Sequence, residues 1–223
     1  EPFDKAKPLT NDQRPIANYF WSRNSKYLLY VQDKGGNENY QLFAVNPMDK
    51  PVLPGNVPPG RNLSNKENSM VQIVHISRSN SDLIYIAIND RDASWHDLYE
   101  LKISTGELKL LTKNTDRYTN WIFDQKDKLR LLIRSNTNGS TDLLRIDQNT
   151  ITTIYSGSVL EEFYPINFHS DGNNVYLISN VGIKRNFSEL VLFDIYKLKE
   201  TVIESDPKNK VDIDNAIFSE LDN

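Results

Sequence analysis

The chain has 223 residues, 38% of them hydrophobic and 10% aromatic, a composition typical of a globular protein with a sizeable core. Its 26 basic and 30 acidic residues are interspersed and give a net charge of −4, which argues against nucleic acid as a partner. It has no cysteine, which excludes disulfides and thiolate chemistry, and no apolar run near the ~18 residues of a membrane span.

Five aromatic or aliphatic anchors recur along the chain at nearly even intervals. They are Trp21, Ile76, Phe123, Phe168 and Phe218. The intervals, about 55, 47, 45 and 50 residues, match the period of a four-stranded propeller blade. The sequence therefore predicts an all-β fold, a partial β-propeller of about four four-stranded antiparallel blades of the WD/TolB-like type.

Each repeat is expected to supply four short strands, in units of about 11–64, 65–114, 115–158 and 159–207. The innermost strands are predicted at 17–21, 71–76, 119–123 and 165–168. The second strands, at 27–32, 83–89, 129–134 and 175–179, are continuous apolar runs, as expected for strands packed on both faces. The third are predicted at 40–45, 97–101, 142–146 and 189–194, and the outer ones, which should be polar edges, at 61–63, 108–111, 152–155 and 201–204.

The connections and ends complete this single-domain prediction over 1–223. Five prolines between Pro47 and Pro59 predict a long loop before the first outer strand. Residues 1–10 resemble the tail of an outer strand and 208–223 contain what resembles an innermost strand, so both ends are expected to belong to incomplete blades. An open arc of this kind would expose apolar strands and is expected to self-associate.

Three segments of the sequence resemble a known family. The stretch from Tyr19 to Val45, with WSRNSK followed by DKGGNENYQLF, resembles the propeller of the prolyl oligopeptidase family, especially its acylaminoacyl-peptidase and dipeptidyl-aminopeptidase-like bacterial members. Segments 89–107 and 205–219 resemble other parts of the same propellers. The resemblance implies a serine peptidase with two parts, in which the propeller covers an α/β-hydrolase domain and admits short peptides.

The sequence departs from this family in one respect. It contains no GxSxG nucleophile elbow, and neither Ser140 nor Ser158 lies in a strand–Ser–helix context. We therefore expect no catalytic residue, cofactor or metal here, and a hydrolase domain of the same polypeptide outside this chain as the partner. The N-terminus lacks a signal peptide, which leaves a bacterial cytoplasm or periplasm open.

Two groups of residues are candidate substrate or channel contacts. The resemblance implies that Glu161 and Glu162 could bind a substrate amine, as a glutamate pair does in dipeptidyl peptidases of this family. Polar residues of the innermost strands could line a central channel. They are Asn18, Gln72, Asn120, Asn167 and Asp214.

Metal sites and other functions are weaker alternatives. His75, His96 and His169 fall in different units and are expected to be structural or surface residues. Residues 33–39 alternate oxygen ligands in a way that could suggest calcium, but they fit a hairpin turn better. A TolB-like scaffold that binds proteins, and a lactonase-type calcium propeller, remain alternatives to the peptidase propeller.

Overall fold

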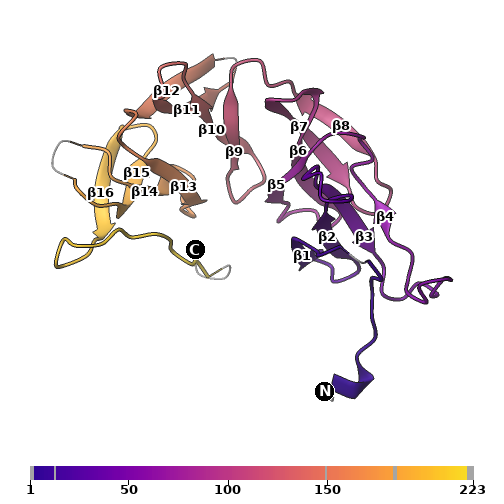
Figure 1. The fold of residues 1–223 in the computed structure, drawn as a ribbon. Coiled ribbons are helices and arrows are strands. Elements are labelled where there is room, and N and C mark those ends of the chain that lie inside the picture. The colour runs from indigo at the N-terminus through magenta and orange to yellow at the C-terminus, as the bar shows by residue number, and fades with distance from the viewer. Residues whose placement is uncertain (1–2, 13, 149, 183–184, 220–223) are drawn as a thin grey trace. The chain divides into compact units, whose positions relative to one another are not determined.

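The computed structural model describes residues 3–12, 14–148, 150–182 and 185–219. They form sixteen strands and one short 3₁₀ helix, η1 (Phe3–Lys5) (Figure 1). The chain divides into two compact units, Glu1–Asn114 and Thr115–Asn223, and each is described by itself. None of the described residues form a helix with the length and apolar character needed to cross a bilayer.

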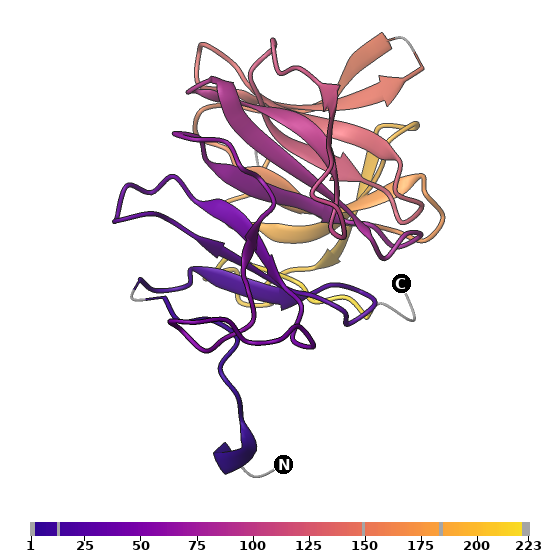
Figure 2. The ribbon, with the colours of Figure 1, turned by 90° about the vertical axis from the view of Figure 1, so that its right-hand side faces the viewer.

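Unit 1 contains two four-stranded antiparallel sheets, in which the strands follow one another in chain order. The first sheet comprises β1 (Asn18–Trp21), β2 (Leu28–Gln32), β3 (Gln41–Val45) and β4 (Arg61–Asn62), and the second comprises β5 (Val71–Ile76), β6 (Leu83–Asp92), β7 (Trp95–Lys102) and β8 (Leu108–Thr112). Figure 2 shows the strands of the second sheet side by side.

Unit 2 repeats the same topology. Its first sheet comprises β9 (Tyr118–Phe123), β10 (Leu129–Ser135), β11 (Thr141–Asp147) and β12 (Thr150–Gly157), and its second comprises β13 (Phe163–Phe168), β14 (Asn174–Ser179), β15 (Glu189–Asp194) and β16 (Lys199–Glu204). A four-stranded antiparallel meander of this kind is the blade of a β-propeller. The predicted fold class, an all-β partial propeller of four blades, is confirmed, whereas the single-domain boundaries stay a prediction.

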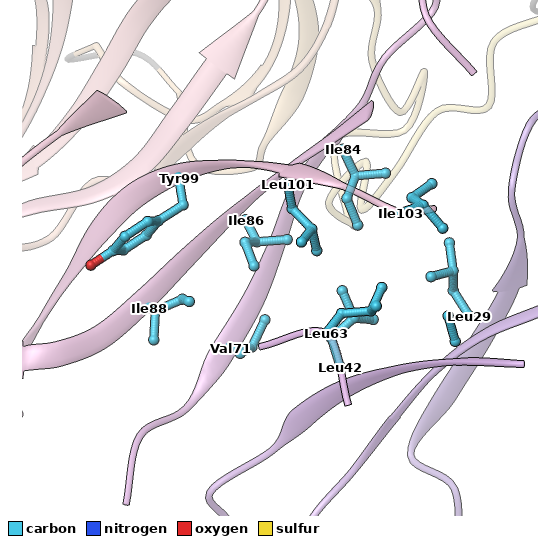
Figure 3. Packing of buried hydrophobic residues seen from close by; sticks show 11 residues of the cluster. Leu29, Leu42, Leu63, Val71, Ile84, Ile86, Ile88, Tyr99, Leu101 and Ile103 are labelled. Carbon is cyan, nitrogen blue, oxygen red and sulfur yellow. The ribbon is translucent and has the colours of Figure 1, made fainter. Parts of the chain in front are cut away.

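The core of unit 1 lies between its two sheets. Leu29 and Leu42 of the first sheet, both fully buried, pack in one cluster with Ile84, Ile86 and Leu101 of the second (Figure 3). Residues 84–88 of β6 are all buried, although successive side chains point to opposite faces of the strand. Burial on both faces explains why the sequence of this strand is a continuous apolar run.

The core of unit 2 is built in the same way. Leu131 and Leu143 of the β9–β12 sheet pack in one cluster with Val175, Leu177 and Phe193 of the β13–β16 sheet. All five side chains are at most 2% exposed, so each sheet buries one apolar face against its neighbour.

In each unit an arginine also connects the two blades. Arg61 of β4 donates hydrogen bonds to the carbonyl oxygens of Ile103 (2.5 Å) and Ser104 (2.8 Å), which lie in the turn after β7. Arg145 of β11 donates to the carbonyl oxygen of Ile195 in the matching turn after β15. Both guanidinium groups satisfy carbonyl groups that no strand ladder reaches.

Local details differ from the prediction. The second strand of the second sheet, predicted at 83–89, continues as β6 as far as Asp92, because Asp92 pairs with Trp95 of β7. The described residues form no strand at 7–10 or 208–219, and the assignment of the two ends to incomplete blades stays a prediction. The outer strands are less polar than expected, since Leu110 and Val202 are more than 40% exposed. Residues 1–2 and 220–223 lie outside the described part.

Candidate functional site

One edge of unit 1 gathers the β2–β3 hairpin, the β4–β5 connection and the β6–β7 hairpin, and we call it the hairpin edge. The backbone N–H of Val71 donates to the carbonyl oxygen of Tyr40 (2.8 Å), and Lys66 forms an ion pair with Asp90 (2.8 Å). The N–H of Met70 donates to the side-chain oxygen of Asn89 at 2.6 Å. These contacts fix three loops against one another, as a binding site on loops requires.

A cleft of about 400 Å³ opens at this edge, and we call it the amide cleft. Its lining residues are Lys34, Asn37, Asn39, Gln41, Asn62, Asn65, Lys66, Glu67 and Asn68. An adjoining pocket of about 320 Å³ shares Lys34, Gln41 and Asn62 with it. The sequence analysis missed this site; its only signal was the seven asparagines between positions 37 and 68, five of which line the cleft.

The β2–β3 hairpin is held in place by Asp33. This buried carboxylate binds Arg14 (Nη2–Oδ1, 3.1 Å) and accepts a hydrogen bond from the N–H of Glu38 (3.2 Å). Burial alone would raise its pKa, but these hydrogen bonds outweigh that effect and hold the pKa of Asp33 below its usual range. Gly35 and Gly36 both have positive φ, so residues 33–39 form the expected hairpin turn.

The matching edge of unit 2 contains the predicted glutamate pair. The Glu161 carboxylate accepts hydrogen bonds from the N–H groups of Ser158 and Gly182, both at 2.9 Å, and these donors hold its pKa below the usual range. Glu162 is exposed and bonds Asn180 only through its backbone. Within the described ranges, therefore, the Glu162 carboxylate has no partner, whereas Glu161 is committed to joining two loops.

The innermost-strand residues show a pattern that the sequence analysis detected only in part. Asn18 and Asn120 each accept a hydrogen bond from the next residue's N–H at 2.8 Å, and Asn215 does the same. Each lies three residues before an anchor, so Asn215, not the predicted Asp214, is the periodic equivalent. Asp214 instead accepts the Tyr164 hydroxyl on its backbone carbonyl.

Gln72 and Asn167 lie on β5 and β13, which are also the first strands of their sheets. The structure therefore places four of the five predicted channel residues on the first strand of a sheet, two in each unit, and their role in a channel stays a prediction.

The three histidines lie on three different elements. His75 lies on β5, His96 on β7, and His169 in a turn where it contacts Asp171 (3.0 Å). Over residues 3–12, 14–148, 150–182 and 185–219, no group of three or more His, Asp or Glu side chains is arranged to hold a metal ion.

His96 gives a pH-dependent prediction. Among the residues that the structure describes, its Nε2 atom is buried without a hydrogen-bond partner, and burial lowers the pKa of the imidazole, an effect that the charge of Asp97 partly opposes. The folded state therefore disfavours the protonated ring. We expect the free energy of unfolding to fall as the pH drops below about 6.5, the ordinary histidine pKa.

Chemical denaturation between neutral pH and pH 5 measures this effect. His96→Gln should make the unfolding free energy depend less on pH because it removes the titrating group, whereas His169→Gln, in a turn of unit 2, should leave that dependence in place. An unchanged slope in His96→Gln would assign the pH dependence to other groups.

Comparison with known proteins supports the resemblance seen in the sequence. No family model matches the chain. Dipeptidyl aminopeptidase BIII of Pseudoxanthomonas mexicana is 29% identical over 211 residues, which are 93% of this chain and 29% of that protein. Dipeptidyl peptidase family member 6 of Caenorhabditis elegans is 24% identical over 193 residues, 81% of this chain and 25% of that protein.

Solved structures show the same fold at low sequence identity. A puromycin-hydrolyzing peptidase of Mycobacterium tuberculosis matches 91% of this chain with a TM-score of 0.60 and 11% identity, over 30% of its own length. A prolyl endopeptidase matches 82% of the chain with a TM-score of 0.54 and 10% identity, over 25% of its length. The chain thus spans between a quarter and a third of the proteins it matches, and it is a β-propeller similar to those of prolyl oligopeptidase-family peptidases.

Proposed function

We propose that this chain is the non-catalytic propeller of a prolyl-oligopeptidase-like serine peptidase. In this role it restricts access of peptides to an α/β-hydrolase domain of the same polypeptide. The observation that carries the proposal is the alignment with a dipeptidyl aminopeptidase over 93% of this chain but only 29% of that protein. The remaining length of that relative leaves room for a catalytic domain.

The described residues suit a gate better than a catalyst. Buried side chains hold each pair of blades together, so a pair can act as a rigid wall. The chain has no nucleophile elbow, so the proposal takes the nucleophile from the hydrolase domain. A wall around an active site excludes large substrates by size, and short peptides are the class that such a gate admits.

Within this proposal Glu162 is the better candidate to bind a substrate amine. Its carboxylate is exposed and, within the part of the chain that the structure describes, unpaired, whereas Glu161 is held by two backbone donors. Asn120, Asn167 and Asp214 remain proposed channel contacts. Self-association also remains proposed, supported by the exposure of Tyr19 (67%) and Trp21 (49%) on β1.

The test uses a fluorophosphonate probe, which labels activated serines. The 223-residue chain alone should take no label and cleave no aminoacyl-nitroanilide. The protein translated from the whole reading frame should contain GxSxG followed by Asp and His, take the label at that serine, and cleave short peptides faster than long ones. A reading frame without these motifs would favour a scaffold propeller, and labelling of the isolated chain would contradict the proposal.

A further inference from the structure

Within the described residues, several carboxamide groups of the amide cleft are wholly or partly uncommitted. Within the described ranges, the side chains of Asn39, Asn65 and Asn68 make no hydrogen bond. Asn37 and Asn62 use their Oδ1 atoms to accept from nearby backbone N–H groups, which leaves their Nδ2 donors without a partner in the same ranges. The cleft therefore offers both donors and acceptors to a ligand.

The charges of the cleft nearly cancel. Lys66 is neutralised by Asp90 at 2.8 Å, and the remaining Lys34 and Glu67 carry opposite charges. An anionic ligand such as a phosphate or a nucleic acid would find no excess positive charge here. A ligand with neutral hydrogen-bonding groups fits this surface best.

We propose that the amide cleft binds the main chain of an extended peptide. A carboxamide presents N–H donors beside a carbonyl acceptor, and the N–H and C=O of one residue in an extended chain point to the same side, so the two can form paired hydrogen bonds. The cleft continues into the adjoining pocket through Lys34, Gln41 and Asn62, which suits an elongated ligand. Its volume lies within the usual range of ligand sites.

The lining also favours a peptide over a saccharide. None of the described residues that line the amide cleft is aromatic, so a sugar ring would find no flat surface there on which to stack. Phe43 lines only the adjoining pocket and is itself stacked on Tyr30 at 5.0 Å. A peptide main chain needs only the hydrogen-bonding groups.

The cleft is held in shape before a ligand arrives. Gln41 donates to the carbonyl oxygen of Ser69 (2.6 Å) and accepts from the hydroxyl of Ser64 (2.8 Å). Gln41, on β3, is thereby bonded to both ends of the β4–β5 connection. A site that is already ordered loses little entropy on binding.

This inference deepens the proposed function and rests on it for the choice of a peptide, but the binding itself needs no hydrolase. The probe is N-acetyl-tetraalanine amide, which has a main chain and no charge, titrated into the 223-residue chain by NMR. We expect saturable shifts of the residues lining the cleft and little change in affinity with salt. Asn39→Leu and Asn68→Gly, the latter chosen because Asn68 has positive φ, should each weaken binding about fivefold to tenfold.

The control is Asn173→Leu, at an exposed asparagine in a turn of unit 2, and it should bind like the parent chain. Circular dichroism checks that each variant is folded. Absence of saturable binding, equal loss in the control, or binding of maltotetraose in place of the peptide would overturn the inference. None of these results alters the fluorophosphonate outcome of the whole protein, so failure here is distinct from failure of the proposed function.

Discussion

Replacement of Asp97 by alanine is expected to lower the free energy of unfolding of unit 1 by about 3 kcal/mol. Asp97 lies on β7 and is 1% exposed. Its carboxylate accepts from Arg91 Nε (2.8 Å) and Nη2 (2.7 Å), and from the N–H of Asn114 (2.7 Å). The alanine variant removes the acceptor from both partners in a region that water reaches poorly.

The same carboxylate gives the variant a pH signature. Burial alone would raise the pKa of Asp97, but the hydrogen bonds from Arg91 and Asn114 outweigh it, so the folded pKa lies below the ordinary value of 3.8. Its contribution to stability is therefore complete at neutral pH, and it is lost as the pH falls below 3.8 through the folded pKa. The difference in stability between parent and variant should shrink over that acidic range.

Urea denaturation followed by circular dichroism measures both effects. The matched control is Glu107→Ala, because Glu107 pairs with Lys102 at 2.7 Å while both side chains are about half exposed. Water screens such a surface pair, so Glu107→Ala should lower the free energy of unfolding by only a small fraction of the decrease in Asp97→Ala. Equal decreases in the free energy of unfolding of the two variants would show that burial of the Arg91–Asp97 pair does not add to stability.

An arginine–carboxylate pair stands near the second-to-third-strand hairpin of every blade. Arg134 binds Asp142 at 2.7 Å, and Arg185 binds Glu189 at 2.8 Å. Arg91–Asp97 and Arg14–Asp33 occupy the matching places in unit 1. The two partners of a pair are separated by four to nineteen residues in the sequence, so no fixed spacing predicts these pairs.

The strands could be predicted from the sequence because they depend on the pattern of neighbouring residues along the chain. A residue such as Ile86 is apolar in a run of apolar residues, and the anchors recur with the blade period. The extension of β6 to Asp92 could not be predicted, because Asn89 to Asp92 are polar and a polar stretch resembles a loop. Its strand pairing depends on Trp95, across the hairpin.

The candidate sites could not be predicted from the sequence, because they depend on which residues lie close together in space. Glu161 and Glu162 are neighbours in the sequence, yet one carboxylate is bound by backbone donors and the other is exposed. Asn39 and Asn68 are distant in the sequence and line one cleft. Only tertiary contacts, such as the hydrogen bond from Gln41 to Ser69, bring such residues together.

Replacement of Phe193 by alanine is expected to destabilise unit 2 by about 3–5 kcal/mol. Phe193 lies on β15, is 2% exposed, and contacts the ring of Tyr155 edge to face at 5.0 Å between centroids. Tyr155 comes from β12 of the neighbouring blade, and burial raises its pKa to about 12. The variant would remove apolar contact between the two blades and leave a cavity that the rigid sheets cannot close.

The three tryptophans allow this loss to be assigned to one unit. Trp21 and Trp95 lie in unit 1, whereas Trp121 of β9 lies in unit 2 and is 4% exposed. In a background with the first two changed to phenylalanine, the fluorescence of Trp121 reports unfolding of unit 2 alone. Ile203→Ala, at a half-exposed position on β16, is the control and should shift the transition little. If Phe193→Ala shifts the unfolding transition no more than this control, the packing between β12 and β15 does not hold the two blades together. The proposed peptide gate could then no longer rest on a rigid wall of blades.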